Sequence, residues 1–100
     1  MCIRDSIDCL PDRIVVEVPA KINNQGIYGI TLENYPKGFG NLLNSQVGVI
    51  QLTTEAILSK SKHFAYLALL ADPVVDNAIA AEKLLDNIIE KQSEFLGYLN

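Results

Sequence analysis

The stretch Asn41–Pro73, NLLNSQVGVIQLTTEAILSKSKHFAYLALLADP, decides the fold. Apolar residues recur in it at the spacing that aligns side chains along helical faces, and Phe64–Ala71 is apolar nearly all round. The stretch predicts two consecutive helices with a polar hinge at Ser59–Lys62. Asp72–Pro73 should end the second helix, because proline disfavours helix in the residue before it. Helices with so little polar surface need cover on several sides, so this pair belongs in the middle of something larger.

Two strands are predicted before these helices. Arg13–Val18 is rich in β-branched residues, and Pro19 should weaken pairing after it because proline cannot donate to a ladder. Ala20–Ile22 continues extended to a turn at Asn23–Gly26, and Ile27–Leu32 forms the returning strand. The sequence therefore predicts an antiparallel hairpin closed at that turn.

The last predicted helix begins after Asp76, which serves as its N-cap, and runs to about Leu96. Its apolar residues form an inward stripe of Ala81, Leu84, Leu85, Ile88, Ile89, Phe95 and Leu96. Its polar residues form a solvated face of Glu82, Lys83, Asp86, Asn87, Glu90 and Lys91. This separation is typical of an outer helix. The predicted fold class is α+β, an antiparallel β-hairpin followed by three helices.

Composition bounds the class of protein. One hundred residues make one domain at most, or part of one. Charged residues are 20% of the chain, below the roughly 25% of average soluble proteins, which suggests surface normally hidden by more protein. An ordinary compact domain with a large core fits the same composition. The net charge of −4 and the lack of a basic run argue against nucleic-acid binding.

No apolar run reaches the roughly 20 residues that a bilayer requires, and the N-terminus has no basic-then-apolar signal peptide. We therefore expect the reducing cytoplasm. Cys2 and Cys9 form no CxxC pattern, so neither redox nor zinc chemistry is indicated.

The opening MCIRDS, Met1–Ser6, resembles the translation of a sequencing adapter. We expect these residues to be a non-native, structureless tail, with the true gene beginning upstream. Residues 7–100 are then expected to be a partial C-terminal domain of a larger enzyme.

Candidate catalytic groups are few and do not converge. His63, the single histidine, lies at the polar hinge without a metal-ligand partner at suitable spacing. Glu17 and Glu33 could approach each other, although the solvated face of a half-buried hairpin is the simpler role. Three further side chains, Thr54, Ser59 and Ser61, have no base and orienting group in view. Four acidic residues at i, i+4 spacing form a solvated ladder: Glu82, Asp86, Glu90 and Glu94. We predict no catalytic, cofactor-binding or metal-binding residue in this chain.

Several stretches in order resemble the C-terminal end of glycoside hydrolase family 4, the NAD-dependent α-galactosidases, α-glucosidases, α-glucuronidases and 6-phospho-glycosidases. The resemblance rests on Leu10–Ala20 (LPDRIVVEVPA), Gly26-Ile27, Val47–Ile57 (VGVIQLTTEAI), the stop Leu69–Val75 (LLADPVV) and Leu84-Leu85-Asp86. It covers nearly everything after Ile7.

Three departures from the family pattern concern the subfamily and substrate. Gly29 stands where proline is frequent, and Thr54 stands where valine is usual. Ser59–Lys62 replaces a turn that in the family more often reads Thr-Gly-Asp-Arg.

The resemblance implies a parent with an N-terminal Rossmann domain and a C-terminal domain like that of lactate and malate dehydrogenases. It implies redox-assisted elimination of a glycoside with NAD and a divalent metal, manganese being the expected ion. The family's metal-binding Cys and His, its base and its glycine-rich loop lie upstream of this stretch, and Cys9 and His63 do not match their contexts. The expected partners are the remainder of the parent, its sugar substrate and further subunits of a homo-oligomer.

Two other functions stay open at this point. The chain could be a stand-alone helical interaction module that uses the hairpin and the last helix as a partner surface. It could also be the tail of a malate or lactate dehydrogenase relative, in which case paired catalytic His and Asp residues would lie upstream.

Overall fold

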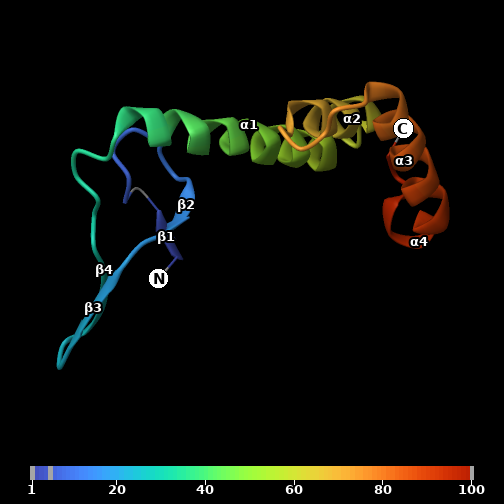
Figure 1. Cartoon of the computed structure of the whole chain (residues 1–100). Helices are drawn as coiled ribbons and strands as arrows, with labels where there is room; N and C mark the ends of the chain where they lie inside the picture. The colour runs from blue at the N-terminus through green and yellow to red at the C-terminus, as the bar shows by residue number, and fades with distance from the viewer. Residues whose placement is uncertain (1, 5, 100) are drawn as a thin grey trace. The chain divides into compact units, whose positions relative to one another are not determined.

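The computed structural model describes residues 2–4 and 6–99. Its elements, in chain order, are β1 (Cys2–Arg4), β2 (Val15–Glu17), β3 (Ala20–Asn23), β4 (Gly26–Gly29), α1 (Lys37–Ser59), α2 (Lys62–Ala71), α3 (Ala78–Lys91) and α4 (Ser93–Leu96). Figure 1 shows the strands preceding the helices, which confirms the predicted α+β class and its order. The chain divides into two compact units, Met1–Asn44 and Ser45–Asn100, and each is described by itself.

The predicted hairpin of the first unit is confirmed at its turn. Strands β3 and β4 pair antiparallel, with Ile22 opposite Ile27 and Asn23 opposite Gly26 (Figure 1). The Asn23 Oδ1 accepts a 2.9 Å hydrogen bond from the backbone N–H of Gln25, as asparagine does in tight turns. Gly26 has a φ of 141°, which side-chain-bearing residues rarely adopt.

Both predicted strands are shorter than expected. The segment Arg13–Val18 is a regular strand only over Val15–Glu17, and Arg13 has a positive φ of 70°. Pro19 separates β2 from β3, and its carbonyl accepts a 2.9 Å hydrogen bond from the N–H of Ile30. The returning strand ends at Gly29 instead of Leu32. The interruption by proline therefore divides one predicted hairpin into two separate ladders.

The other ladder joins β2 to β1, with Ile3 opposite Val16. Ser6 and Ile7 follow and are buried, and the carbonyl of Ser6 accepts a 2.7 Å hydrogen bond from the N–H of Leu32. The expectation that Met1–Ser6 is structureless is therefore wrong for Cys2–Arg4 and Ser6, because the main chain of β1 meets the hydrogen-bonding needs of β2. Met1 and Asp5 lie outside the described residues. The non-native origin of the hexapeptide stays a prediction.

The two central helices are confirmed. Helix α1 spans 23 residues and ends in a paired C-terminal turn, in which Lys60 N–H donates to the carbonyl of Ile57 and Ser61 N–H donates to that of Ala56. Lys60 has a φ of 54°, the left-handed conformation that such a motif requires after a helix. Ser61 then caps α2 by accepting a hydrogen bond from the N–H of Phe64. Asp72–Pro73 follows the end of α2 as predicted.

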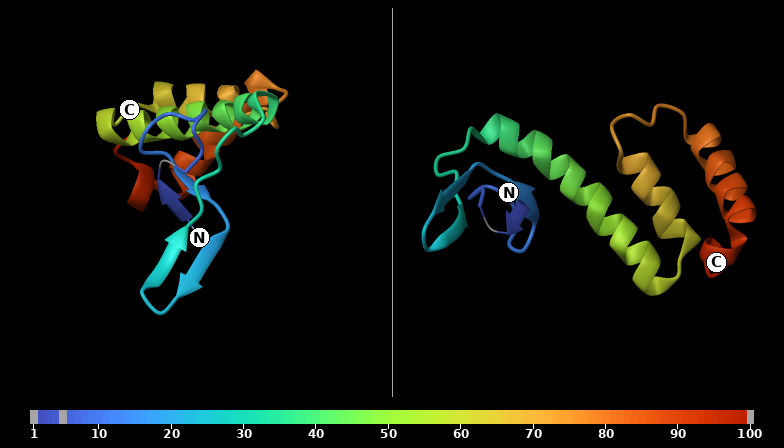
Figure 2. Two further views of the ribbon diagram at one scale, coloured as in Figure 1. Left: turned by 90° about the vertical axis from the view of Figure 1, so that its left-hand side faces the viewer. Right: turned by 90° about the horizontal axis from the view of Figure 1, so that it is seen from below.

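The last helix differs from the prediction at both ends. Its N-cap is Asn77 and not Asp76, since the Asn77 side chain accepts a 2.9 Å hydrogen bond from the N–H of Ala80. The helix ends at Lys91, and the short α4 follows after Gln92. Helices α2 and α3 lie side by side (Figure 2), and the Tyr66 hydroxyl donates to the carbonyl of Ala78.

The inward stripe of the last helix is only partly buried. Ala81 and Leu85 are buried in the second unit, whereas Leu84, Ile88 and Phe95 are exposed. Much of the central stretch is exposed as well: Val47, Ala56 and Ala68 are buried, but Ile50 is 56% exposed and Leu58 75%. The described residues therefore do not supply the cover that the sequence predicts. No helix among them is long and apolar enough to span a membrane.

Candidate functional site

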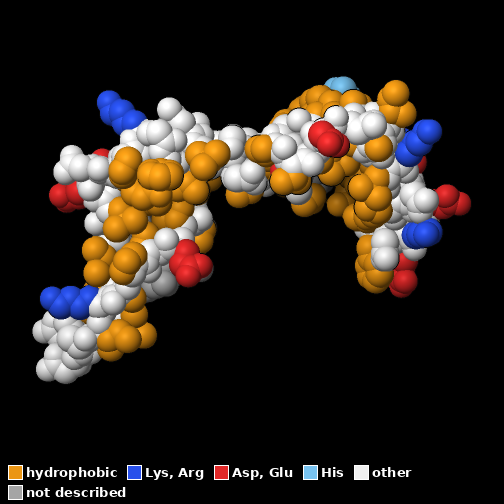
Figure 3. Space-filling model, viewed as in Figure 1, with side chains coloured by type: hydrophobic (Ala, Val, Ile, Leu, Met, Phe, Trp, Pro, Cys, Tyr) orange, Lys and Arg blue, Asp and Glu red, His pale blue; other side chains and the backbone are white. Residues whose placement is uncertain are grey.

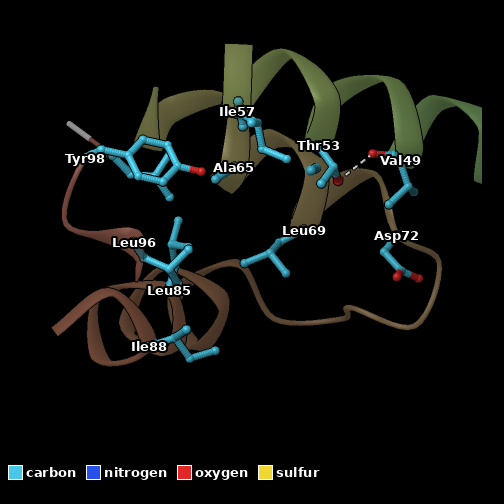
Figure 4. Close-up of a pocket in the computed structure, with 13 residues that line it drawn as sticks. Val49, Thr53, Ile57, Ala65, Leu69, Asp72, Leu85, Ile88, Leu96 and Tyr98 are labelled. Carbon is cyan, nitrogen blue, oxygen red and sulfur yellow. Dashed lines mark hydrogen bonds between the residues drawn. The ribbon is translucent and has the colours of Figure 1, made fainter. Parts of the chain in front are cut away.

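The second unit contains an apolar groove of about 330 Å³. We call it the α1–α3 groove: its walls come from the end of α1, from α2, from α3 and from the chain after α3. Figure 4 shows Ile57, Leu69, Leu85, Ile88, Leu96 and Tyr98 around it. Two local motifs position the helices that line the groove. The Lys60–Ser61 turn reverses the chain between α1 and α2, and the Asn77 cap begins α3.

Two polar side chains at the groove, Thr53 and Asp72, have hydrogen-bond partners within the chain. The Thr53 hydroxyl donates a 2.8 Å hydrogen bond to the carbonyl of Val49 (Figure 4). The Asp72 Oδ1 accepts a 3.1 Å hydrogen bond from the N–H of Val74. The rest of the lining is apolar apart from the Tyr98 hydroxyl, so the groove offers few hydrogen-bonding groups that could orient a polar substrate. The groove is therefore suited to holding apolar side chains and not to acid–base or nucleophilic chemistry.

His63 lies at the first turn of α2, on the surface. Its ring faces that of Phe64 at a centroid distance of 6.2 Å, tilted by 59°. The nearest hollow is a shallow one that it lines together with Lys62, Tyr66, Glu82 and Leu85. His63 is therefore an exposed side chain that contacts its neighbour Phe64.

The carboxylates considered from the sequence do not form a metal site. Glu17 and Glu33 are both exposed in the first unit. The acidic ladder of α3 and α4 is exposed too, and its Asp86 pairs with Lys62 of α2. Among the described residues, no group of three or more His, Cys, Asp or Glu side chains lies together as a metal ion would require.

The candidate nucleophiles are engaged with the main chain. The Thr54 hydroxyl donates to the carbonyl of Ile50 at 2.9 Å, and the Ser59 hydroxyl donates to that of Glu55 at 2.6 Å. Ser61 serves as the cap of α2. Cys9 is an exposed free thiol in the first unit, and the side chain of Cys2 lies outside the described part. These hydrogen bonds give the three hydroxyls a role in helix structure.

The sequence did not indicate Tyr98 and Leu99 as groove residues, although both line it. Periodicity identifies the apolar face of a helix, but it cannot show that residues after the last helix turn back toward that face. The apolar residues Tyr98 and Leu99 at the end of the described chain are the sequence feature that could have indicated this contact.

Comparison with protein families gives one clear match. Residues 4–75 match the family described as Family 4 glycosyl hydrolase C-terminal domain. The match begins at Arg4, the last residue of β1, includes β2, β3, β4, α1 and α2, and ends before α3.

Relatives with known activities extend the match over almost the whole chain. The chain is 41% identical over 96 residues to an alpha-glucosidase of Erwinia rhapontici, which covers 96% of this chain and 21% of the relative. It is 33% identical over 81 residues to a maltose-6'-phosphate glucosidase of Bacillus subtilis, covering 81% of this chain and 18% of the relative. It is 29% identical over 91 residues to a 6-phospho-beta-glucosidase of Thermotoga maritima, covering 91% of this chain and 22% of the relative.

The chain thus spans about one fifth of the length of these relatives. No solved structure matches it significantly.

Proposed function

The chain belongs to the family 4 glycosyl hydrolases, and on this premise we propose that it is the supporting C-terminal section of a glycosidase whose catalytic groups lie in the preceding polypeptide. The parent would hydrolyse O-glycosyl bonds by the NAD- and metal-dependent elimination that the family resemblance implies. The observation that carries the proposal is the family match over residues 4–75.

NAD and the divalent metal belong to the parent in this proposal. The described residues do not fit either group, since they hold no metal-binding cluster and the sequence has no glycine-rich phosphate loop. Manganese is the ion we propose for the parent, on the family resemblance. The contribution of this chain is structural: it supplies helices against which the catalytic part is held.

A glucoside is the proposed substrate class. All three relatives named above are glucosidases by name, two of them acting on phosphorylated glucosides. The comparisons favour this reading over the tail of a dehydrogenase. We further propose the cytoplasm as the compartment, on the sequence features alone, and a homo-oligomer as the assembly.

The proposal is tested by reading the DNA upstream of the codon for Ile7. We expect an open frame that encodes a glycine-rich nucleotide loop and a Cys and His pair suited to a metal. A stop codon immediately before Ile7 would contradict the proposal. Paired catalytic His and Asp residues without the Cys would point to the dehydrogenase alternative.

A second test uses the alpha-glucosidase of Erwinia rhapontici. A chimera carries this chain in place of the matched 96-residue segment of that enzyme. We expect the chimera to hydrolyse an α-glucoside with NAD and manganese, while this chain alone does not. A chimera that folds and is inactive, or an isolated chain that is active, would count against the proposed division of roles.

A further inference from the structure

We propose that the α1–α3 groove receives apolar side chains from the polypeptide that precedes this chain in the parent. The inference rests on the proposed function and extends it by assigning the contact surface and its occupant. It commits to the same parent chain as the partner.

The chemistry of the groove selects an apolar occupant. Leu69, Leu85 and Leu96 face it from separate elements (Figure 4). Of its polar side chains, Thr53 and Asp72 are hydrogen-bonded to the main chain, and Tyr98 adds one hydroxyl. A polar ligand would lose its water and find few partners among these mostly apolar side chains, which is unfavourable. Apolar side chains have no hydrogen bonds to water to lose, and burying them in the groove is favourable in free energy.

The apolar surface extends beyond the groove, which favours a large partner. Ile50 and Leu58 do not line the groove, yet both are more than half exposed on α1. In Figure 3 apolar side chains gather around α2 and its neighbours. One short helix in the groove would leave such residues in water, whereas a domain can cover several sides at once.

The polar face of α3 lies outside the groove and is exposed to water. Six polar residues of α3 are exposed, and one of them, Asp86, pairs with Lys62 at the surface. Covering this face would strip charged groups of water without compensation. The groove side is therefore the covered side, and the polar face of α3 is the free one.

The lengths of the relatives decide between the parent chain and a second copy. About four fifths of each relative lies outside the matched segment, which is ample polypeptide to cover the groove. A covalently connected partner also acts at a high effective concentration. The preceding chain is the occupant that both considerations favour.

Cysteine labelling tests the inference in the chimera with the Erwinia rhapontici enzyme. Ala65→Cys places a thiol at the groove, and Asn87→Cys places one on the polar face of α3 as the matched control. Each variant is made in the isolated chain and in the chimera, with Cys2 and Cys9 replaced by serine. A maleimide is the probe, and peptide mass spectrometry reports the labelling rate at each site.

We expect labelling at residue 65 to be at least about tenfold slower in the chimera than in the isolated chain, because a buried site reacts only through local opening. Labelling at residue 87 should be equal in both. Equal rates at residue 65 in an active chimera would overturn the inference and leave the proposed function standing. Protection at both sites would overturn the assignment of the covered face.

Two other outcomes are decisive. Protection at residue 65 in the isolated chain that increases with protein concentration would identify a second copy as the occupant and overturn the inference. A chimera that does not fold, beside a folded parental enzyme, would contradict the proposed function itself, and the inference with it.

Discussion

The Sγ atom of Cys9 occupies the space in which a side chain on Gly40 would begin. Gly40 is buried in the first turns of α1, and its N–H donates a 3.0 Å hydrogen bond to the carbonyl of Pro36. The loop that carries Cys9 therefore approaches α1 closely, and a Cβ at position 40 would require the Cys9 side chain to move.

We predict opposite effects for two glycine replacements in α1. Gly48→Ala should raise the free energy of unfolding by about 1 kcal/mol, because alanine favours helix and a Cβ there meets no atom within 4 Å. Gly40→Ala should lower it by about 1 kcal/mol, since overpacking costs more than the helical gain. Urea denaturation followed by circular dichroism measures both.

The Cys9→Ala, Gly40→Ala double variant supplies the control for this close contact. Removing the Sγ should restore most of the stability lost in Gly40→Ala, because the obstructing atom is gone. If Gly40→Ala alone stabilised the chain as much as Gly48→Ala, the close approach of Cys9 would be refuted.

Lys60→Gly should stabilise the chain by up to about 1 kcal/mol. Lys60 holds the left-handed conformation after α1, which costs an L-residue about 1–2 kcal/mol and costs glycine nothing of that kind. Glycine gives back part of the gain through its freedom in the unfolded chain. Lys60→Ala is the matched control: it removes the same charge, keeps the Cβ and should show no gain. Equal denaturation midpoints for the two variants would contradict the prediction.

Asn77→Ala should cost about 1 kcal/mol of stability, and Asp76→Ala only a few tenths. The Asn77 side chain bonds to the N–H of Ala80, so its loss leaves an unpaired donor at the start of α3. Asp76 retains only a weak interaction with the helix dipole. Thermal denaturation measures both variants. A larger loss of stability in Asp76→Ala than in Asn77→Ala would show that Asp76 is the N-cap, as the sequence predicted.

The Lys62–Asp86 ion pair should contribute less than about 1 kcal/mol, because both side chains are roughly half exposed and water screens them. A double-mutant cycle of Lys62→Met and Asp86→Asn measures the coupling. We expect it to fade as salt rises to about 1 M. Asp86→Asn also relieves repulsion from Glu82 and Glu90, so its single effect should be small. A salt-independent coupling would indicate a buried pair and contradict this placement.

Deletion of residues 1–6 should loosen β2. Its main chain pairs with β1 over Val15–Glu17, and the carbonyl of Ser6 holds the N–H of Leu32. We expect faster amide hydrogen exchange at Val16 and Leu32, with little change at Ile22 of the separate β3–β4 ladder. Unchanged exchange at Val16 would show that β1 does not protect it.

The local features of the fold could be predicted from sequence because short segments determine them. The Asn23–Gly26 turn, the interruption at Pro19 and the stop at Asp72–Pro73 depend on the backbone preferences of the residues involved. The choice between Asp76 and Asn77 as cap could not be predicted, because both residue types cap helices well and one backbone angle decides between them.

The groove and the first ladder depend on residues distant in sequence. Thr53, Leu69 and Tyr98 meet at one hollow, and no periodicity within a single helix reveals that meeting. The pairing of β1 with β2 could not be predicted from the composition of Met1–Ser6, because strand pairing joins main-chain groups and depends little on side-chain identity. The prediction that this chain holds no catalytic residue is tested by comparing the activity of the chimera with that of the isolated chain.

The ladder between β1 and β2 carries a consequence for the origin of the hexapeptide. If MCIRDS is foreign to the gene, then β1 pairs with Val15–Glu17 at an edge where another strand belongs in the native protein. The exposed main chain of an edge strand can pair with almost any extended segment. In the complete gene product, the native preceding residues would then pair with β2 in place of Met1–Ser6.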